Sequence, residues 1–229
     1  MIKFFLRIIE RIMFGFWIYL WSDIYMLWRK RDKKFLSYKW RDYVRFSSLE
    51  LVAYEINSKN IAWNCAELWV YRWDFAGKIN EVFPTKKIYL FDTFEWFHEN
   101  DLSIEKKEKF SHWQQWFTDT NEKIVMSNMK YPNQCIIKKW YFPDTTLWID
   151  DTFCFVSLDA DLYKPTYDGL SFFYPKLVKW GYIFIHDFNN YEYTWVRKAI
   201  EQFCGQQWIW YFPLTDNCGS VVIVSYTWF

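Results

Sequence analysis

Two apolar segments that run into acidic side chains constrain the fold of this chain more than any other feature. Residues 153–158 and 181–185 are almost wholly apolar; Asp159 follows the first directly, and Asp187 comes two residues after the second. Such segments are typical of buried strands in a parallel sheet. The 28 residues between the carboxylates leave room for a strand–helix–strand crossover. We therefore expect Asp159 and Asp187 at one sheet edge, where α/β proteins bind ligands.

The rest of the chain alternates between strand-like and helix-like segments. Further strands are predicted at residues 64–70, 87–92, 134–138, 210–213 and 219–224, and helices at 42–59, 74–83, 165–177 and 193–203. Residues 97–130 are polar and irregular, with helical stretches expected within them. This alternation predicts one α/β domain with a largely parallel sheet over residues 41–229.

Glu67 and Asp92 also fall at or near the carboxyl ends of predicted strands, so we expect four carboxylates on one edge. Asp92 follows Glu67 by 25 residues, a spacing that suits a carboxylate that binds the two hydroxyls of a ribose. The turn at residues 69–73 reads Trp-Val-Tyr-Arg-Trp and lacks a G-x-G-x-x-G motif. A nicotinamide dinucleotide is therefore not supported.

The acidic cluster itself favours a divalent cation. Asp159, Asp161 and Asp187 offer the oxygen ligands that Mg²⁺ prefers. A cation at this point lowers the pKa of a substrate hydroxyl, and Asp159 is placed to accept the released proton. Asp159-Ala-Asp161 is also a D-x-D pattern, so a metal-dependent glycosyltransferase is the alternative enzyme class.

Composition restricts the partners only weakly. The net charge is +1, and we interpret the basic run at residues 29–34 as a solvated surface, with no nucleic-acid partner. The five cysteines show no C-x-x-C spacing, which predicts reduced thiols in a cytoplasmic protein. Residues 1–40 are predicted to form an amphipathic helical segment that packs on the domain, on a second subunit or on a membrane surface, since ten apolar residues are too few to span a bilayer.

Five segments, in order, match the pattern of one enzyme family: Ala66–Phe75, Tyr89–Glu95, Cys135–Pro143, Val156–Tyr163 and Tyr182–Asp187. On these segments the chain resembles, over about residues 41–225, the macrocin O-methyltransferase family. Members transfer a methyl group from S-adenosylmethionine to a sugar hydroxyl. The resemblance implies a Rossmann-like class I methyltransferase domain with a seven-stranded, mostly parallel sheet, helices on both faces and an antiparallel last strand.

The resemblance also implies roles for individual residues. The expected cofactor-binding residues are Glu67, Trp69, Tyr71, Arg72, Asp92, Thr93 and Trp140. The expected Mg²⁺ ligands are Asp159, Asp161 and Asp187, with Asp159 as the catalytic base. His186 is expected to face the site, either as a ligand or as a structural residue, whereas His98 and His112 carry no assignable role. The implied acceptor is a sugar-like small molecule; the oligomeric state is left open.

The chain departs from the family pattern in one systematic way. It has 17 Trp and 6 Gly, and Trp stands at several positions where the family has Gly or another small residue: 63, 69, 73, 96, 140 and 180. A left-handed backbone and a close approach to a ligand both favour Gly. We therefore expect Trp69 and Trp73 to impair cofactor binding. The alternative is a non-catalytic interaction protein with aromatic surface residues.

Overall fold

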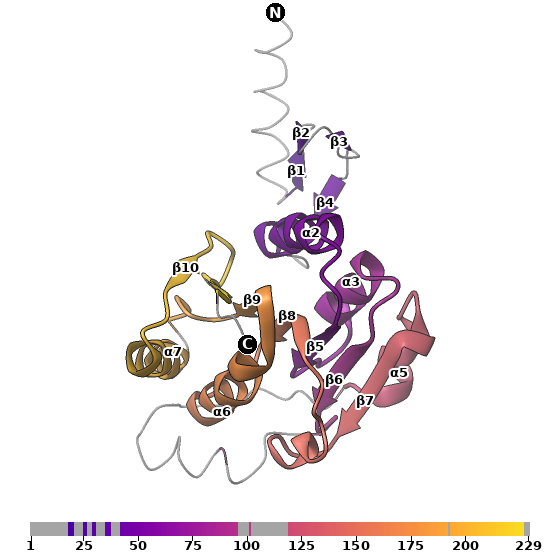
Figure 1. The fold of residues 1–229 in the computed structure, drawn as a ribbon. Helices are drawn as coiled ribbons and strands as arrows, with labels where there is room; N and C mark the ends of the chain where they lie inside the picture. The colour runs from indigo at the N-terminus through magenta and orange to yellow at the C-terminus, as the bar shows by residue number, and fades with distance from the viewer. Residues whose placement is uncertain are drawn as a thin grey trace, which may run out of the picture.

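The computed structural model describes residues 42–95, 101, 119–191 and 193–226, together with four short strands between residues 18 and 37. The main body is a seven-stranded sheet with helices on both faces (Figure 1). Its strands are β5 (Asn64–Leu68), β6 (Ile88–Asp92), β7 (Cys135–Lys139), β8 (Phe153–Leu158), β9 (Leu177–Ile185), β10 (Tyr211–Pro213) and β11 (Val221–Val224). Its helices are α2 (Tyr43–Ser58), α3 (Asp74–Val82), α5 (Glu122–Ser127), α6 (Tyr163–Phe173) and α7 (Thr194–Gln207), with short 3₁₀ turns at Pro132–Gln134, Asp144–Thr146 and Tyr174–Lys176.

The strand pairing confirms the predicted seven-stranded, mostly parallel sheet. The order is β10-β11-β9-β8-β5-β6-β7, and the pairs among β7, β6, β5, β8 and β9 are parallel. The last strand, β11, runs antiparallel to both β9 and β10, as expected. The chain order reverses between β5 and β8, which lie side by side, and this is where an open α/β sheet forms its ligand crevice.

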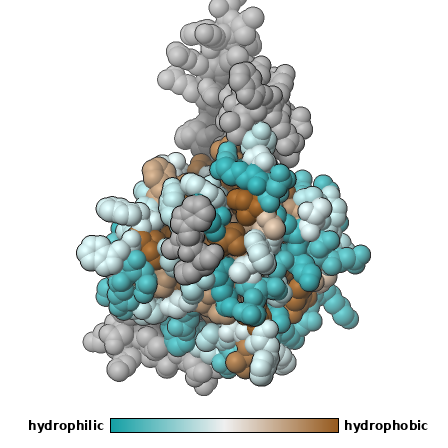
Figure 2. Space-filling view, viewed as in Figure 1, coloured by the Kyte–Doolittle hydropathy of each residue, from teal (hydrophilic) through white to brown (hydrophobic). Residues whose placement is uncertain are grey.

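The sheet divides the core into two layers. Within β5, Ala66 and Leu68 pack with α6 and α7, whereas Cys65 packs with α2, α3 and α5. This alternation is the two-residue period of a strand covered on both faces. Figure 2 shows that the surface turned toward the viewer is mostly hydrophilic or neutral, with apolar side chains only in small areas. None of the helices in the described residues is long and apolar enough to cross a membrane.

Only part of the predicted N-terminal helical segment can be compared with the structure. Strand β1 (Ile18–Leu20) pairs antiparallel with β4 (Phe35–Ser37), and β2 (Tyr25–Met26) pairs with β3 (Arg29–Lys30). The helix prediction is therefore wrong for these residues, where backbone pairing replaces helical hydrogen bonds. The rest of the segment lies outside the described residues, as do Trp96, His98 and His112.

The helix predicted at residues 165–177 was misplaced at both ends. Helix α6 begins at Tyr163 and ends at Phe173, a 3₁₀ turn follows, and Leu177 already belongs to β9. Pro175 lies in that turn, and a proline lacks the N–H that would continue an α-helix. Strand β9 is longer than predicted because its first half reaches back to pair with Phe153, with a register shift before Phe155.

Tryptophan occupies left-handed backbone positions throughout the described residues. Eleven non-glycine residues have positive φ, and six of them are Trp: Trp63, Trp69, Trp140, Trp148, Trp180 and Trp208. For a bulky residue such a φ is a genuine outlier, and it costs roughly 1–2 kcal/mol at each position. Trp73 is different: its φ of 173° is extended backbone, so the expectation of a left-handed turn there was wrong.

Phe173 lies at the centre of an aromatic cluster between α6 and the sheet. Its side chain is fully buried, with ring centroids 5.2 Å from Phe153, 5.6 Å from Phe91 and 4.9 Å from Phe172. We expect Phe173→Ala to lower the free energy of unfolding by about 3–5 kcal/mol, because it opens a cavity at this point. Phe212→Ala, at an exposed site on β10, should change it by less than about 0.5 kcal/mol. Urea denaturation measures both, and equal losses would contradict the assignment of this core.

Candidate functional site

A cavity of about 450 Å³ lies at the carboxyl edge of the sheet. This volume is typical of a site for a small molecule or cofactor. The four predicted edge carboxylates, Glu67, Asp92, Asp159 and Asp187, all line it. The other predicted site residues line it as well: Trp69, Tyr71, Arg72, Thr93, Trp140, Asp161 and His186. The structure thus brings all the predicted site residues together around one space.

The Asp92 carboxylate holds the turn after β5 through hydrogen bonds from the backbone of that turn. Its Oδ2 accepts hydrogen bonds from the backbone N–H groups of Val70 and Tyr71, both at 2.8 Å, and its Oδ1 accepts one from Phe94 at 2.6 Å. Burial raises the pKa of Asp92, and these three N–H donors counteract the shift in part. The carboxylate is therefore held in one orientation at the end of β6, beside the turn that begins at Trp69.

The turn is covered by residues that the sequence analysis missed. The Tyr71 hydroxyl donates to Asp119 at 2.7 Å, Arg72 forms an ion pair with Asp119, and Thr120 donates to the Tyr71 carbonyl. Asp119 and Thr120 lie within the irregular region at residues 97–130, where no periodic pattern marked them. Thr93 bonds locally, with its hydroxyl donating to the Glu95 carbonyl at 3.0 Å.

Glu67 is the most deeply buried acid of the edge, at 2% exposure. Its Oε1 accepts a hydrogen bond from the Ser157 hydroxyl at 3.2 Å, whereas its Oε2 is buried and has no hydrogen-bond partner. Burial raises the pKa of Glu67 to about 8, even though the nearby Arg45 guanidinium favours the charged form. Glu67 is therefore largely protonated at neutral pH in this structure.

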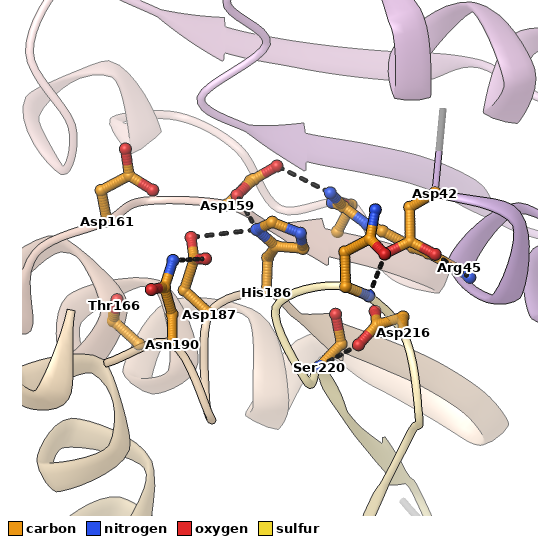
Figure 3. A network of polar contacts seen from close by, with 12 residues as sticks. Asp42, Arg45, Asp159, Asp161, Thr166, His186, Asp187, Asn190, Asp216 and Ser220 are labelled. Carbon is orange, nitrogen blue, oxygen red and sulfur yellow. Dashed lines mark hydrogen bonds and ion pairs between the residues drawn. The ribbon is translucent and has the colours of Figure 1, made fainter. Parts of the chain in front are cut away.

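Arg45 and His186 place positive charge beside the Asp159 and Asp187 carboxylates at the carboxyl edge of the sheet (Figure 3). Arg45 Nη1 lies 2.8 Å from Asp159 Oδ2, and His186 Nδ1 lies 2.9 Å from both Asp159 Oδ1 and Asp187 Oδ2. Burial alone would raise the pKa of Asp159, but these two cations hold it well below its usual value. Burial opposes the charged imidazolium of His186, yet the Asp159 and Asp187 carboxylates together outweigh burial and raise the pKa of His186.

Asp161 completes a group of three carboxylates. One oxygen from each of Asp159, Asp161 and Asp187 lies within 4.8 Å of the others. Burial raises the pKa of Asp161 well above its usual value, and the charges of Asp187 and Asp159 raise it further. Asn190 fixes Asp187 by donating to its Oδ1 at 2.8 Å. Three converging oxygens with repelling charges form a donor set that fits a hard divalent cation.

Arg45 is the main residue of the site that the sequence analysis missed. It shares the buried stripe of α2 with Leu49, Ala53 and Ile56, at the spacing of one helix face. An arginine is almost never buried unless it is paired. A single arginine on an otherwise apolar stripe was therefore an available signal for a buried acidic partner, although not for which acid.

Comparison with known families identifies the chain. The sequence model of the macrocin-O-methyltransferase (TylF) family matches residues 29–216. The chain belongs to this family. It is therefore an S-adenosylmethionine-dependent O-methyltransferase by family, which decides against the D-x-D glycosyltransferase as the enzyme class. No curated protein sequence matches the chain significantly.

Solved structures agree with this assignment at the level of the fold. The O-methyltransferase NovP superposes with a TM-score of 0.61 at 18% identity, covering 80% of each chain. The calicheamicin methyltransferase CalS11 has a TM-score of 0.61 at 14% identity, covering 79% of this chain and 78% of its own. TomG from Streptomyces achromogenes, an O-methyltransferase in complex with S-adenosylmethionine, has a TM-score of 0.52 at 10% identity, covering 78% of this chain and 80% of its own.

The raised pKa of Glu67 predicts a pH-dependent stability. Folded Glu67 keeps its proton up to about pH 8, whereas an ordinary glutamate loses it near pH 4.5. The folded state therefore binds more protons between these values, and stability falls as pH rises through the window. We expect wild type to lose roughly 3–5 kcal/mol relative to Glu67→Gln between pH 4.5 and 8. Urea denaturation at a series of pH values measures this difference, and parallel curves for the two proteins would show that Glu67 is ionised when folded.

Proposed function

We propose that this methyltransferase transfers a methyl group from S-adenosylmethionine to the hydroxyl of a sugar-like small molecule, assisted by a divalent cation such as Mg²⁺. The observation that carries the proposal is the convergence of the edge carboxylates on one cavity in a member of this family. A similar structure, CalS11, is a TDP-rhamnose 3'-O-methyltransferase in calicheamicin biosynthesis, which supports a small-molecule acceptor with a sugar hydroxyl.

The charge of the cavity favours a cationic cofactor. Nine acidic side chains and three cationic ones line it, so the acids remain in excess even with Glu67 protonated. S-adenosylmethionine carries a sulfonium and an ammonium group, both of which are attracted to such a cavity.

Two carboxyl groups fit the polar parts of the cofactor. Asp92, held by its three backbone N–H donors, is proposed to accept hydrogen bonds from the ribose hydroxyls. Glu67 has a buried oxygen without a hydrogen-bond partner, and a buried polar atom of this kind calls for a ligand or water. We assign Tyr71, Arg72 and Thr93 to the wall of the same subsite because they line the cavity.

The three-carboxylate group is the proposed metal site. Asp159, Asp161 and Asp187 would hold the cation, which supplies positive charge that lowers the pKa of the acceptor hydroxyl. Asp159 is proposed as the base. The Arg45 and His186 cations keep it ionised, so it is ready to accept a proton, but its low pKa makes it a weak base. It therefore requires an acceptor hydroxyl whose own pKa has been lowered.

Trp69 and Trp140 narrow the cofactor subsite. Both have left-handed backbone, with φ of 68° and 105°, and both line the cavity. An indole at these positions takes up space that glycine would leave free for a ligand. Trp73 lies outside the cavity lining and packs against the core layer of α2 and α3 instead. We therefore attribute the proposed impairment to Trp69 and Trp140 rather than to Trp73.

Calorimetric titration with S-adenosylmethionine tests the cofactor site. The double variant Trp69→Gly/Trp140→Gly should bind in the micromolar range and at least tenfold more tightly than wild type, because the subsite opens. Trp73→Gly is the matched control, and it should leave the affinity of wild type unchanged. Adding Asp92→Asn to the double variant should weaken binding by about tenfold or more, since a charge-assisted acceptor is lost. A double variant that is folded by circular dichroism but does not bind would refute the proposed site.

Removal of metal tests the three-carboxylate group. In the same double-variant background, a chelator should abolish methyl transfer to a sugar acceptor, and added Mg²⁺ should restore it. Asp187→Asn should raise the Mg²⁺ concentration for half-maximal rate by about tenfold or more, because one ligand loses its charge. Asp150→Asn is the control: Asp150 is exposed and belongs neither to the cavity lining nor to the group of three, so it should not change this concentration. Full activity in the chelator would exclude the cation.

A further inference from the structure

In the described residues, tryptophan occupies left-handed backbone positions at which glycine is the usual residue. Of the five glycines in the described residues, just Gly219 has a positive φ, whereas six tryptophans do. Five of these six are exposed on the surface, Trp148 and Trp208 almost completely. Left-handed positions on a surface are where glycine is normally the default residue. The backbone at these six sites is therefore the backbone of a glycine-bearing chain.

Hydrogen bonding at two of the sites identifies motifs that require glycine. The Ile149 N–H donates to the Thr146 carbonyl at 3.0 Å, with Leu147 at φ −52°, ψ 130° and Trp148 at φ 67°. These angles define a type II turn, whose third residue is normally Gly or Asn. Trp208 ends α7 in the left-handed conformation, and Ile209 donates back to Cys204 at 2.9 Å. This is a helix C-terminal motif that typically uses Gly.

The six tryptophans do not share a surface or a function. Trp69 and Trp140 lie at the carboxyl edge of the sheet and line the cavity. Trp63 precedes β5, and Trp180 lies in the first half of β9 beside a register shift, so both are at the opposite edge. Trp148 and Trp208 lie in a loop and at a helix end. An aromatic binding surface would gather on one face, so the shared property is the backbone conformation alone.

A cause that acts on codons explains this pattern better than selection at each site. The chain has 6 glycines, where average usage predicts about 16, and it has 17 tryptophans. Ordinary point mutation of glycine codons yields mainly Ala, Ser, Arg, Asp, Glu and Val. A single residue type, Trp, at six of the eleven non-glycine left-handed positions in the described residues indicates one codon with two meanings. UGA is such a codon, because different genetic codes assign it to stop, to tryptophan or to glycine.

We propose that positions 63, 69, 140, 148, 180 and 208 are encoded by UGA and that the cell that makes this protein reads UGA as glycine. The functional polypeptide then carries glycine at all six positions. Its backbone is relaxed at the turns, and its cofactor subsite is free of the indoles of Trp69 and Trp140. Trp195 is a true tryptophan: it is buried, its φ is not positive, and its Nε1 donates to the Asp161 carbonyl.

The codons and the native peptide masses decide the proposal. Sequencing of the gene should show UGA at the six positions and UGG at position 195. Mass spectrometry of tryptic peptides from the protein isolated from its own cells should give glycine masses at the six positions and a tryptophan mass at position 195. UGG codons at the six positions overturn the proposal, and so do UGA codons with tryptophan masses. Neither readout depends on cofactor binding, so the proposal can fail separately from the proposed function.

Thermal unfolding tests the structural basis of the inference away from the cavity. The fourfold variant Trp63→Gly/Trp148→Gly/Trp180→Gly/Trp208→Gly should melt about 10 °C or more above the chain with tryptophan, because four left-handed positions are relieved. Trp195→Gly should melt about 10 °C lower, because it removes a buried ring and its hydrogen bond. A fourfold variant that melts lower than the parent chain would show that these tryptophans stabilise the fold and would contradict the structural premise.

Discussion

Charge neutralisation at the carboxyl edge of the sheet is the interaction on which the rest of the site depends. Parallel strands bring Glu67, Asp159 and Asp187 into a buried space, where unpaired carboxylates are costly. Arg45 and His186 neutralise the negative charges of Asp159 and Asp187, whereas Glu67 avoids a buried charge by keeping its proton. Asp161 is left among like charges. The pairings of Arg45 and His186 therefore stabilise the edge, and Asp161 is the group on it whose charge the proposed cation would neutralise.

The pairing also links elements that are distant in sequence. Arg45 comes from α2, Asp159 follows β8, and His186 follows β9, so one network connects the helix that covers one face with two central strands. Asp42, the residue that caps α2, accepts a hydrogen bond from the backbone of Asn217 at 2.6 Å in the segment before β11. The site is thus closed on one side by the first helix and the last loop of the domain.

The positions of the left-handed tryptophans indicate how this chain is translated. The acidic edge of the sheet is combined with the indoles of Trp69 and Trp140 in the cavity lining, and the remaining four indoles lie outside that lining. A chain selected to lose activity would alter the site and leave the distant turns unchanged. The distribution instead follows backbone conformation, which is why a cause at the level of translation accounts for both groups at once.

The sequence by itself determined the strands, their largely parallel arrangement and the gathering of Asp92, Asp159 and Asp187 at one edge, because strand periodicity and crossover length are local properties. Helix ends were less accurate, as at α6, where Pro175 permits a 3₁₀ turn that periodicity does not register. Only the tertiary structure decided that Arg45 pairs with Asp159 and that Trp73 lies outside the cavity. Such pairings join residues more than a hundred positions apart, and their geometry arises only when helix and sheet pack together.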